Sequence, residues 1–88
     1  MNNNKFTTKL LDVVTTKNLD KLNYVFIIME SSESDLKMLM NNIKDVEFNE
    51  SHIITIMYNS LCALNFIHTA NVMHRDIKPA NLLINHEC

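Results

Sequence analysis

Residues 74–81 read His74-Arg75-Asp76-Ile77-Lys78-Pro79-Ala80-Asn81. This segment gathers a histidine, charged side chains of both signs and an amide, and its proline fixes one backbone angle. A short apolar run lies on each side of it, Val72-Met73 before and Leu82-Leu83-Ile84 after. The pattern predicts a polar loop between two apolar segments, and its side chains are the first candidates for chemistry.

A long amphipathic helix is predicted immediately before this loop. Asn49 is a suitable N-cap, and nothing interrupts the helix from there to about His68, with the first break at Asn71. Its apolar residues recur at spacings of three and four, so they share one stripe, which would be exposed without a covering surface. These residues are Ile53, Ile56, Met57, Leu61, Leu64 and Ile67.

The first part of the chain carries two β-prone runs, Leu10–Val14 and Tyr24–Met29. The polar segment Thr15–Asn23 between them has the composition of a loop. We therefore expect an antiparallel hairpin.

A short helix is expected between the hairpin and the long helix, at about Leu36–Asn42. Either Ser34 or Asp35 can cap its first turn. Strands followed by helices in one short chain predict the α+β class.

Length, charge and hydropathy limit the possible functions. The chain has 88 residues, a mass of 10.2 kDa, a net charge of −2 and 47% hydrophobic residues. These values describe one small globular domain or a piece of a larger one. The slight negative charge argues against general nucleic-acid or membrane-surface binding. The longest apolar run, Val25–Met29, is too short to span a bilayer, and no apolar signal segment follows Met1.

Cysteine, glycine and histidine usage add further limits. Cys62 and Cys88 do not form a Cys-x-x-Cys pair, so we expect free thiols in a reducing compartment. The sequence has no glycine, which excludes a Gly-rich nucleotide-binding loop within these residues. The spacing of His52, His68 and His86 does not match a metal site.

The polar loop matches the catalytic-loop pattern of protein kinases, His-Arg-Asp-x-Lys-Pro-x-Asn. A chance match to so many fixed positions is on the order of one in a million. From Leu10 to Cys88 the chain resembles the middle of a mitogen-activated protein kinase, notably at Ile67–Met73, Glu33–Leu36 and Asn81–Asn85. Cyclin-dependent kinases share Asn-Leu-Leu-Ile-Asn and are the nearest competing group. The Lys-Pro pair resembles Ser/Thr kinases more than tyrosine kinases.

This resemblance implies a partial protein-kinase-like fold of the α+β class. Residues 1–29 would be the end of the small lobe with its β-hairpin, and residues 30–34 would be the hinge. Residues 35–88 would begin the large lobe, with two helices, the catalytic loop at 74–81 and a short strand. The sequence has no Asp-Phe-Gly segment, so we expect a piece of a longer kinase.

The resemblance also implies roles in phosphoryl transfer for the polar residues of the loop. Asp76 would orient the attacking hydroxyl and accept its proton. Lys78 would reach the γ-phosphate of ATP, and Asn81 would hold Mg²⁺. Arg75 would pair with a phosphate on the activation loop. His74 would be mainly structural.

An ATP site is implied next to the loop. Met29 falls at the gatekeeper position, and Glu30 and Ser32 would offer hinge backbone groups to adenine. Asp35 would approach the ribose, and Leu83 would form the floor under the adenine. Simpler explanations stay open for three of them: Met29 as plain core, Asp35 as a helix cap only, and Leu83 as strand core only.

A second, non-catalytic site is implied for partner peptides. In the family, such peptides bind an apolar groove near the helix pair and the strand after the catalytic loop. Residues at or near that groove would be Leu39, Phe48, His52, Thr55 and Cys88. Ordinary packing is the alternative for Leu39 and Phe48.

The expected function is therefore that of an ATP- and Mg²⁺-dependent Ser/Thr protein kinase of the mitogen-activated type, acting on protein substrates. We expect these 88 residues alone to be inactive, because half of the catalytic constellation is missing. The alternatives are a non-catalytic interaction module, a cyclin-dependent-kinase-like member and a decayed remnant. The expected location is intracellular, in the cytoplasm or also in the nucleus, without nucleic-acid or membrane partners.

Overall fold

The computed structural model describes residues 4–15, 24–45 and 47–85. The chain divides into two compact units, Met1–Ser31 and Ser32–Cys88. Their boundary falls within residues 30–34, the segment for which the resemblance implies a hinge. The predicted α+β class is confirmed, since the first unit holds strands and the second holds mainly helices.

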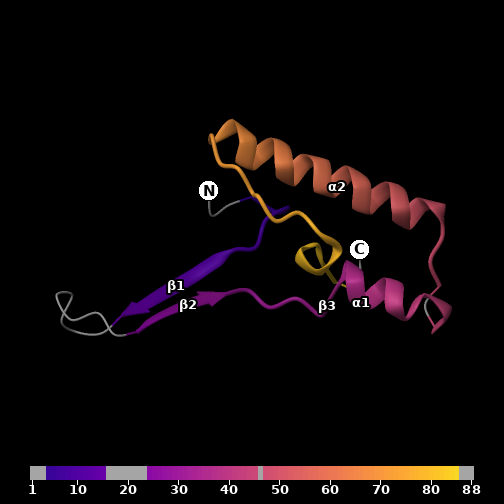
Figure 1. Cartoon of the computed structure of the whole chain (residues 1–88), viewed down its shortest axis with the longest axis horizontal. Coiled ribbons are helices and arrows are strands. Elements are labelled where there is room, and N and C mark those ends of the chain that lie inside the picture. Colours follow the sequence, from indigo (N-terminus) through magenta and orange to yellow (C-terminus); the bar gives the residue numbers. More distant parts are fainter. Residues whose placement is uncertain (1–3, 16–23, 46, 86–88) are drawn as a thin grey trace. The chain divides into compact units, whose positions relative to one another are not determined.

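The first unit is the predicted antiparallel hairpin, formed by β1 (Leu10–Thr15) and β2 (Val25–Met29) (Figure 1). The register pairs Thr15 with Val25 and Leu10 with Met29, and a bulge lies between Leu10 and Asp12. Two hydrogen bonds between Lys9 and Glu30 close the base of the hairpin. The Glu30 backbone N–H donates to the Lys9 carbonyl at 3.0 Å, and the Lys9 N–H donates to Glu30 Oε1 at 2.7 Å.

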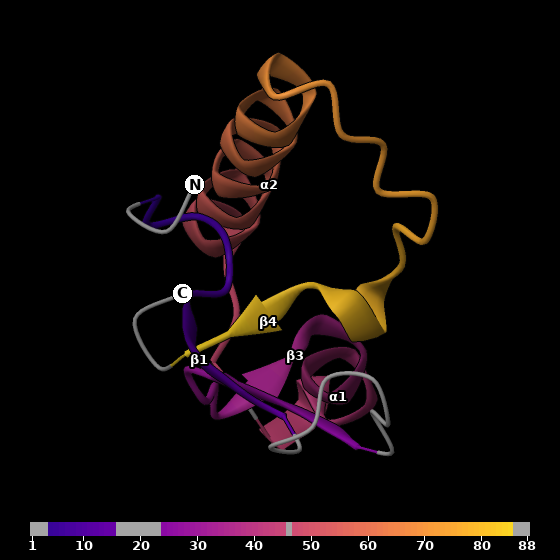
Figure 2. The same cartoon turned by 90° about the vertical axis from the view of Figure 1, so that its left-hand side faces the viewer.

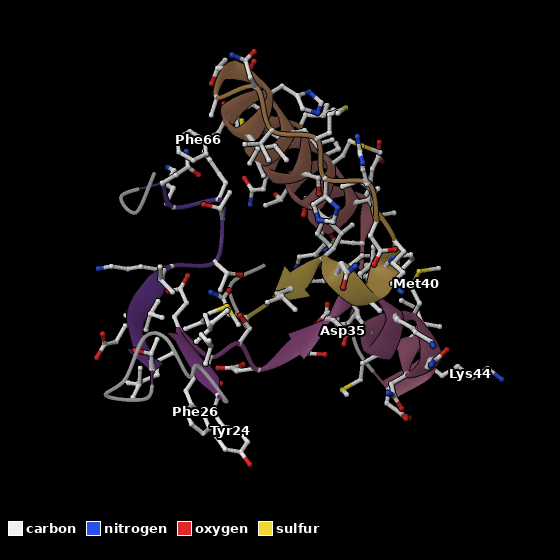
Figure 3. The ribbon with its side chains drawn as sticks, turned by 60° about the vertical axis from the view of Figure 1, so that its left-hand side comes forward. Tyr24, Phe26, Asp35, Met40, Lys44 and Phe66 are labelled. Carbon is white, nitrogen blue, oxygen red and sulfur yellow. The ribbon has the colours of Figure 1, made fainter. Side chains whose placement is uncertain are left out.

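The side chains of the hairpin are exposed on both faces. Tyr24 and Phe26 lie side by side on one face, with ring centroids 6.4 Å apart (Figure 3). Tyr24 is 66% exposed and Phe26 is 60% exposed. A two-stranded hairpin without a covering layer is marginally stable in water, so these apolar faces are surfaces on which other structure can pack.

The second unit ties the short helix to the end of the polar loop. Strand β3 (Ser34–Asp35) pairs antiparallel with β4 (Leu83–Ile84). Helix α1 (Leu36–Asn41) follows β3 directly, and the Leu36 N–H donates to the Leu82 carbonyl at 2.9 Å. Figure 2 shows this strand pair beside α1.

The structure decides between the two predicted caps of α1 in favour of Asp35. Its Oδ1 accepts the Met38 N–H at 2.8 Å, and its backbone is extended, as an N-cap requires. The strand β3 was not predicted. Two polar residues show no alternation of apolar and polar side chains, so their pairing with β4 has no local signal.

Helix α2 (Glu50–Thr69) confirms the predicted long helix and its cap. Asn49 Oδ1 accepts the Ser51 and His52 N–H groups at 3.0 and 3.3 Å. His52 Nδ1 accepts the Asn49 N–H in return at 3.1 Å, which completes a capping box with histidine in the place usually taken by Glu or Gln. The helix ends at the C-cap Ala70, followed by Asn71 in the left-handed region at φ 59°.

Half of the residues in the apolar stripe of α2 are exposed, and the other three, Ile56, Leu64 and Ile67, are half-buried. Ile53, Met57 and Leu61 each keep more than half of their accessible surface, at 52, 59 and 58%. On the same helix, a hydrogen bond with the Cys62 thiol raises the pKa of the Tyr58 phenol, and the charge of Cys62 adds to the effect. Among the described residues none is fully buried. The stripe is therefore a packing surface.

No helix among the described residues is long and apolar enough to cross a membrane. The described residues contain no group of three His, Cys, Asp or Glu side chains placed to hold a metal ion. Cys62 is a free thiol, whereas Cys88 lies outside the described residues.

Candidate catalytic loop

The polar loop is held at both ends by backbone hydrogen bonds. At its start, the Val72 N–H donates to the Ile67 carbonyl in the last turn of α2 at 3.0 Å. At its end, a 3-10 helix, η3 (Pro79–Asn81), leads through Leu82 into β4. Figure 2 shows the chain leaving α2, crossing in an extended path and returning to η3 beside α1. The expected loop between apolar segments is thus present, with an unpredicted turn of helix inside it.

The first part of the loop is a tight turn around Arg75. Arg75 lies in the left-handed region at φ 68°, where residues with a Cβ are uncommon. His74 Nδ1 accepts the Asp76 backbone N–H across this turn at 3.0 Å. The prediction of a mainly structural His74 did not include this bond, although a side-chain acceptor two residues before a donor is a known turn signal.

The second part of the loop brings Asn81 against Asp76. Asn81 Nδ2 donates to the Asp76 carbonyl at 2.9 Å and to its carboxylate Oδ2 at 3.1 Å. The Asn81 backbone N–H donates to the Lys78 carbonyl at 2.9 Å, which fixes η3. Because Nδ2 is engaged with Asp76, the amide Oδ1 of Asn81 is the atom left to bind a cation. An amide oxygen next to a carboxylate suits Mg²⁺.

Lys78 lies over the same carboxylate. Its Nζ is 3.6 Å from Asp76 Oδ2, and the two side chains are 55 and 64% exposed. An ion pair this exposed contributes about 0–1 kcal/mol. Lys78 can therefore leave Asp76 at little energetic cost.

The strand pair places Asp35 and Leu83 opposite each other. They are Cα partners in the β3–β4 ladder, and directly opposed side chains of an antiparallel pair project from the same face. Leu83 is 51% exposed. Asp35 accepts the capping hydrogen bond of α1 with one carboxylate oxygen, Oδ1, and lies where β3 meets that helix (Figure 3). The structure therefore brings two of the implied ATP-site residues together at the end of the loop.

The remaining implied ATP-site residues belong to different parts of the chain. Met29 and Glu30 are in the first unit, and Ser32 begins the second. Met29 is 56% exposed, and the other apolar residues of β2 are exposed too, so its roles as gatekeeper and as plain core both stay predictions. The Glu30 N–H is used inside the hairpin, which leaves its carbonyl as the backbone group for a ligand.

The implied docking residues fall into separate places. Leu39 lines a shallow pocket of about 280 Å³ between α1 and β3–β4, together with Met38 and Ile84. Phe48 and His52 stack on each other with ring centroids 5.6 Å apart. Phe48 and His52 thus form one pair, and Leu39 is the one described residue of the predicted set in the lining of the pocket.

The remaining two implied docking residues are Thr55 and Cys88. The Thr55 hydroxyl donates to the Ser51 carbonyl within α2 at 2.9 Å. Cys88 lies outside the described residues. Met38 and Ile84 were not predicted to line the pocket, because only the pairing of β3 with β4 brings them to it.

Comparison with known proteins shows what the whole chain is similar to. The sequence matches the protein kinase domain over residues 2–88. It is 42% identical over 81 residues to the mitogen-activated protein kinase KSS1 of Saccharomyces cerevisiae, covering 90% of this chain and 22% of that protein. It is 35% identical over 86 residues to the mitogen-activated protein kinase mpkB of Aspergillus fumigatus, covering 98% of this chain and 24% of that protein. The chain thus spans less than a quarter of these relatives.

Proposed function

Since the chain belongs to the protein kinase domain family, we propose that it supplies the catalytic loop of an ATP-dependent Ser/Thr protein kinase of the mitogen-activated type. The observation that carries the proposal is the contact of Asp76 with both Lys78 and Asn81. A carboxylate, a mobile cation and an amide within reach of one another are the groups that phosphoryl transfer needs. The proposed activity is that of the complete protein product of the gene, which we call the gene product.

Asp76 is proposed to orient the substrate and accept its proton. The hydroxyl oxygen of a substrate Ser or Thr attacks the γ-phosphorus of ATP, and a new P–O bond forms. The bond from the γ-phosphorus to the bridging oxygen breaks, and its electron pair leaves with ADP. The hydroxyl proton passes to the Asp76 carboxylate. The 64% exposure of Asp76 leaves room for the hydroxyl beside it.

Lys78 and Asn81 are proposed to hold charge during this step. Lys78 turns from Asp76 to the γ-phosphate, since its exposed ion pair is weak. Asn81 keeps the Asp76 carboxylate in place through Nδ2 and offers Oδ1 to a cation. Bound Mg²⁺ would neutralise the phosphate charge that builds up in phosphoryl transfer. Arg75, exposed at the turn, is proposed to pair with an activation-loop phosphate.

We propose nucleotide-binding roles for residues within each unit. Leu83 would lie under the adenine and Asp35 beside the ribose. Met29 would act as gatekeeper, and the backbone of Glu30 and Ser32 would meet the adenine edge. Leu83 and Met29 are 51 and 56% exposed, so a ligand can reach both side chains.

Asp35 provides a test that separates capping from ribose binding. Asp35→Asn keeps the cap, because Asn is an equally good N-cap, but it turns an amide N–H toward the ribose in place of a carboxylate oxygen. We expect the KM for ATP to rise by about 10-fold, the worth of a hydrogen bond to a charged group, with unchanged stability. Asp35→Ala should additionally lower the unfolding free energy by about 1 kcal/mol. An unchanged KM in Asp35→Asn would leave Asp35 as a cap only.

A partner-binding site is proposed on the pocket between α1 and β3–β4. Its lining includes apolar Met38, Leu39 and Ile84, which suits an apolar side chain of a docking peptide. The stacked Phe48 and His52 are proposed as a separate contact for a partner peptide. We further propose an intracellular location and protein substrates, and we propose that residues 1–88 alone are inactive.

Replacement of Lys78 tests the proposed reaction. Lys78→Met removes the cation but keeps much of the apolar stem, so we expect kcat for phosphoryl transfer to a protein substrate to fall by about 10²- to 10³-fold. Lys44→Met is the matched control, since Lys44 is an exposed lysine on the 3-10 helix η2 (Ile43–Asp45) (Figure 3). Labelled phosphate incorporated into the substrate is the measurement. Equal rates for the two variants would contradict the proposed role of Lys78.

A further inference from the structure

The capping box of α2 contains a histidine, which makes the start of this helix sensitive to protons. Asn49 Oδ1 accepts the N–H groups of Ser51 and His52, and His52 Nδ1 accepts the Asn49 N–H at 3.1 Å in return. The Glu or Gln usually found in this place remains an acceptor at neutral and mildly acidic pH. We propose that proton binding to His52 opens the capping box and thereby loosens the segment that leads through Phe48 into α2.

The hydrogen bond to Asn49 exists only while His52 Nδ1 carries no proton. A neutral imidazole with its hydrogen on Nε2 offers Nδ1 as an acceptor, whereas an imidazolium donates from both nitrogens. After protonation two donors, the Asn49 N–H and the His52 Nδ1–H, face each other across the 3.1 Å contact, so the ring has to turn away. Histidine is the side chain that ordinarily changes its charge between about pH 5 and 8. The capping box therefore opens within that range.

The charges around the ring do not compensate for the lost bond. The first turn of a helix carries a partial positive charge, which repels an imidazolium. The charged side chains nearest to His52 along the chain are Glu47 and Glu50, and η2 adds Lys44 and Asp45. None of the four forms an ion pair with His52 in the part of the chain that the structure describes. No carboxylate there is placed to accept the new Nδ1 proton.

Phe48 connects the capping box to the segment before the helix. Its ring stacks on the His52 imidazole, with centroids 5.6 Å apart and planes inclined by 14°. Phe48 precedes the N-cap, a position at which an apolar side chain fixes the angle of the chain entering a helix. A cation is attracted to an aromatic face, so protonation removes the hydrogen bond and leaves the stack. Because Phe48 and His52 are the separate peptide contact proposed above, any consequence for partner binding rests on the proposed function.

Two variants separate the acceptor of His52 from its ring. His52→Gln keeps an acceptor for the Asn49 N–H, as in an ordinary capping box, and binds no proton in this pH range. His52→Phe keeps a ring that can stack on Phe48 but has no acceptor, so it reproduces the opened box at every pH. His68→Gln is the matched control, since His68 is an exposed histidine in the last turn of α2, where a positive charge is favourable.

The test follows the capping bond by nuclear magnetic resonance in the ¹⁵N-labelled gene product, between about pH 8 and 5.5. At the upper pH we expect a scalar coupling between the Asn49 amide and His52 Nδ1, with the ring proton on Nε2 alone. When the ring gains its second proton, the coupling should disappear and the protection of the Asn49 amide against hydrogen exchange should fall by about 5-fold. His52→Gln should keep this protection at both pH values, and His52→Phe should lack it at both. His68→Gln should behave as the wild type.

Each outcome decides the inference. A coupling that is absent at the upper pH overturns it, as does a coupling that persists in the protonated ring, or a ring that stays neutral throughout. An equal loss of Asn49 protection in the wild type and in His52→Gln also overturns it, because the proton then acts elsewhere. If acid unfolds the gene product, the two variants are compared at the upper pH, where equal Asn49 protection rejects the inference and lower protection in His52→Phe supports it. None of these measurements needs phosphoryl transfer, so a gene product with the expected coupling but no kinase activity would defeat the proposed function alone.

Discussion

Asp76→Ala is expected to lower kcat for phosphoryl transfer by about 10²- to 10⁴-fold, the usual worth of a general base. The variant removes the carboxylate that Lys78 and Asn81 both contact. Substrate hydroxyl groups then lose their proton acceptor, and Asn81 loses one of the two oxygens that its Nδ2 bonds. The KM for ATP should change little, because Asp76 is proposed to act on the hydroxyl and not on the nucleotide.

Asp45→Ala is the matched control for this change, since Asp45 is an exposed aspartate in the same unit. It should leave kcat and KM unchanged. Steady-state rates with saturating ATP, Mg²⁺ and a protein substrate measure the difference. An Asp76→Ala enzyme within a factor of a few of the wild type would show that the loop does not carry the chemistry.

Asn81→Ala is expected to have the second largest effect, because it removes two functions at once. The hydrogen bonds to the Asp76 carbonyl and carboxylate are lost, so the carboxylate is no longer held. The proposed Mg²⁺ ligand is lost as well. We expect kcat to fall by about 10²-fold and the Mg²⁺ concentration at half-maximal rate to rise by at least about 10-fold.

A Mg²⁺ titration of the rate separates these two functions. Asn65→Ala is the control, since Asn65 is an exposed asparagine within α2. If excess Mg²⁺ restores the full rate of Asn81→Ala, the metal contact explains the defect and the bond to Asp76 is dispensable. If the Mg²⁺ requirement is unchanged, the proposed role of Asn81 as a metal ligand is wrong.

The sequence predicts the elements whose side chains repeat over several turns or residues. The stripe from Ile53 to Ile67 sets the extent of α2, and Asn49 sets its start. The apolar runs at Leu10 and Tyr24 predict the hairpin to within one residue at each strand. In these segments local propensity and the spacing of apolar residues agree, so the pattern is sufficient.

The contacts inside the polar loop could not be predicted in the same way. The bond from Asn81 to Asp76 depends on η3, a single turn with no periodic pattern, and the bond from Asp76 to His74 depends on the left-handed Arg75. The motif gives the identity of these residues, but their mutual orientation follows from backbone angles that no sequence period encodes. For the same reason the pairing of Asp35 with Leu83 appears only in the structure.

The most direct test of the account is phosphoamino-acid analysis of a protein substrate incubated with the gene product, Mg²⁺ and ATP labelled in its γ-phosphate. We expect label in phosphoserine and phosphothreonine that is lost on Asp76→Ala and retained on Asp45→Ala. Label that is absent, confined to phosphotyrosine or insensitive to Asp76→Ala would contradict it.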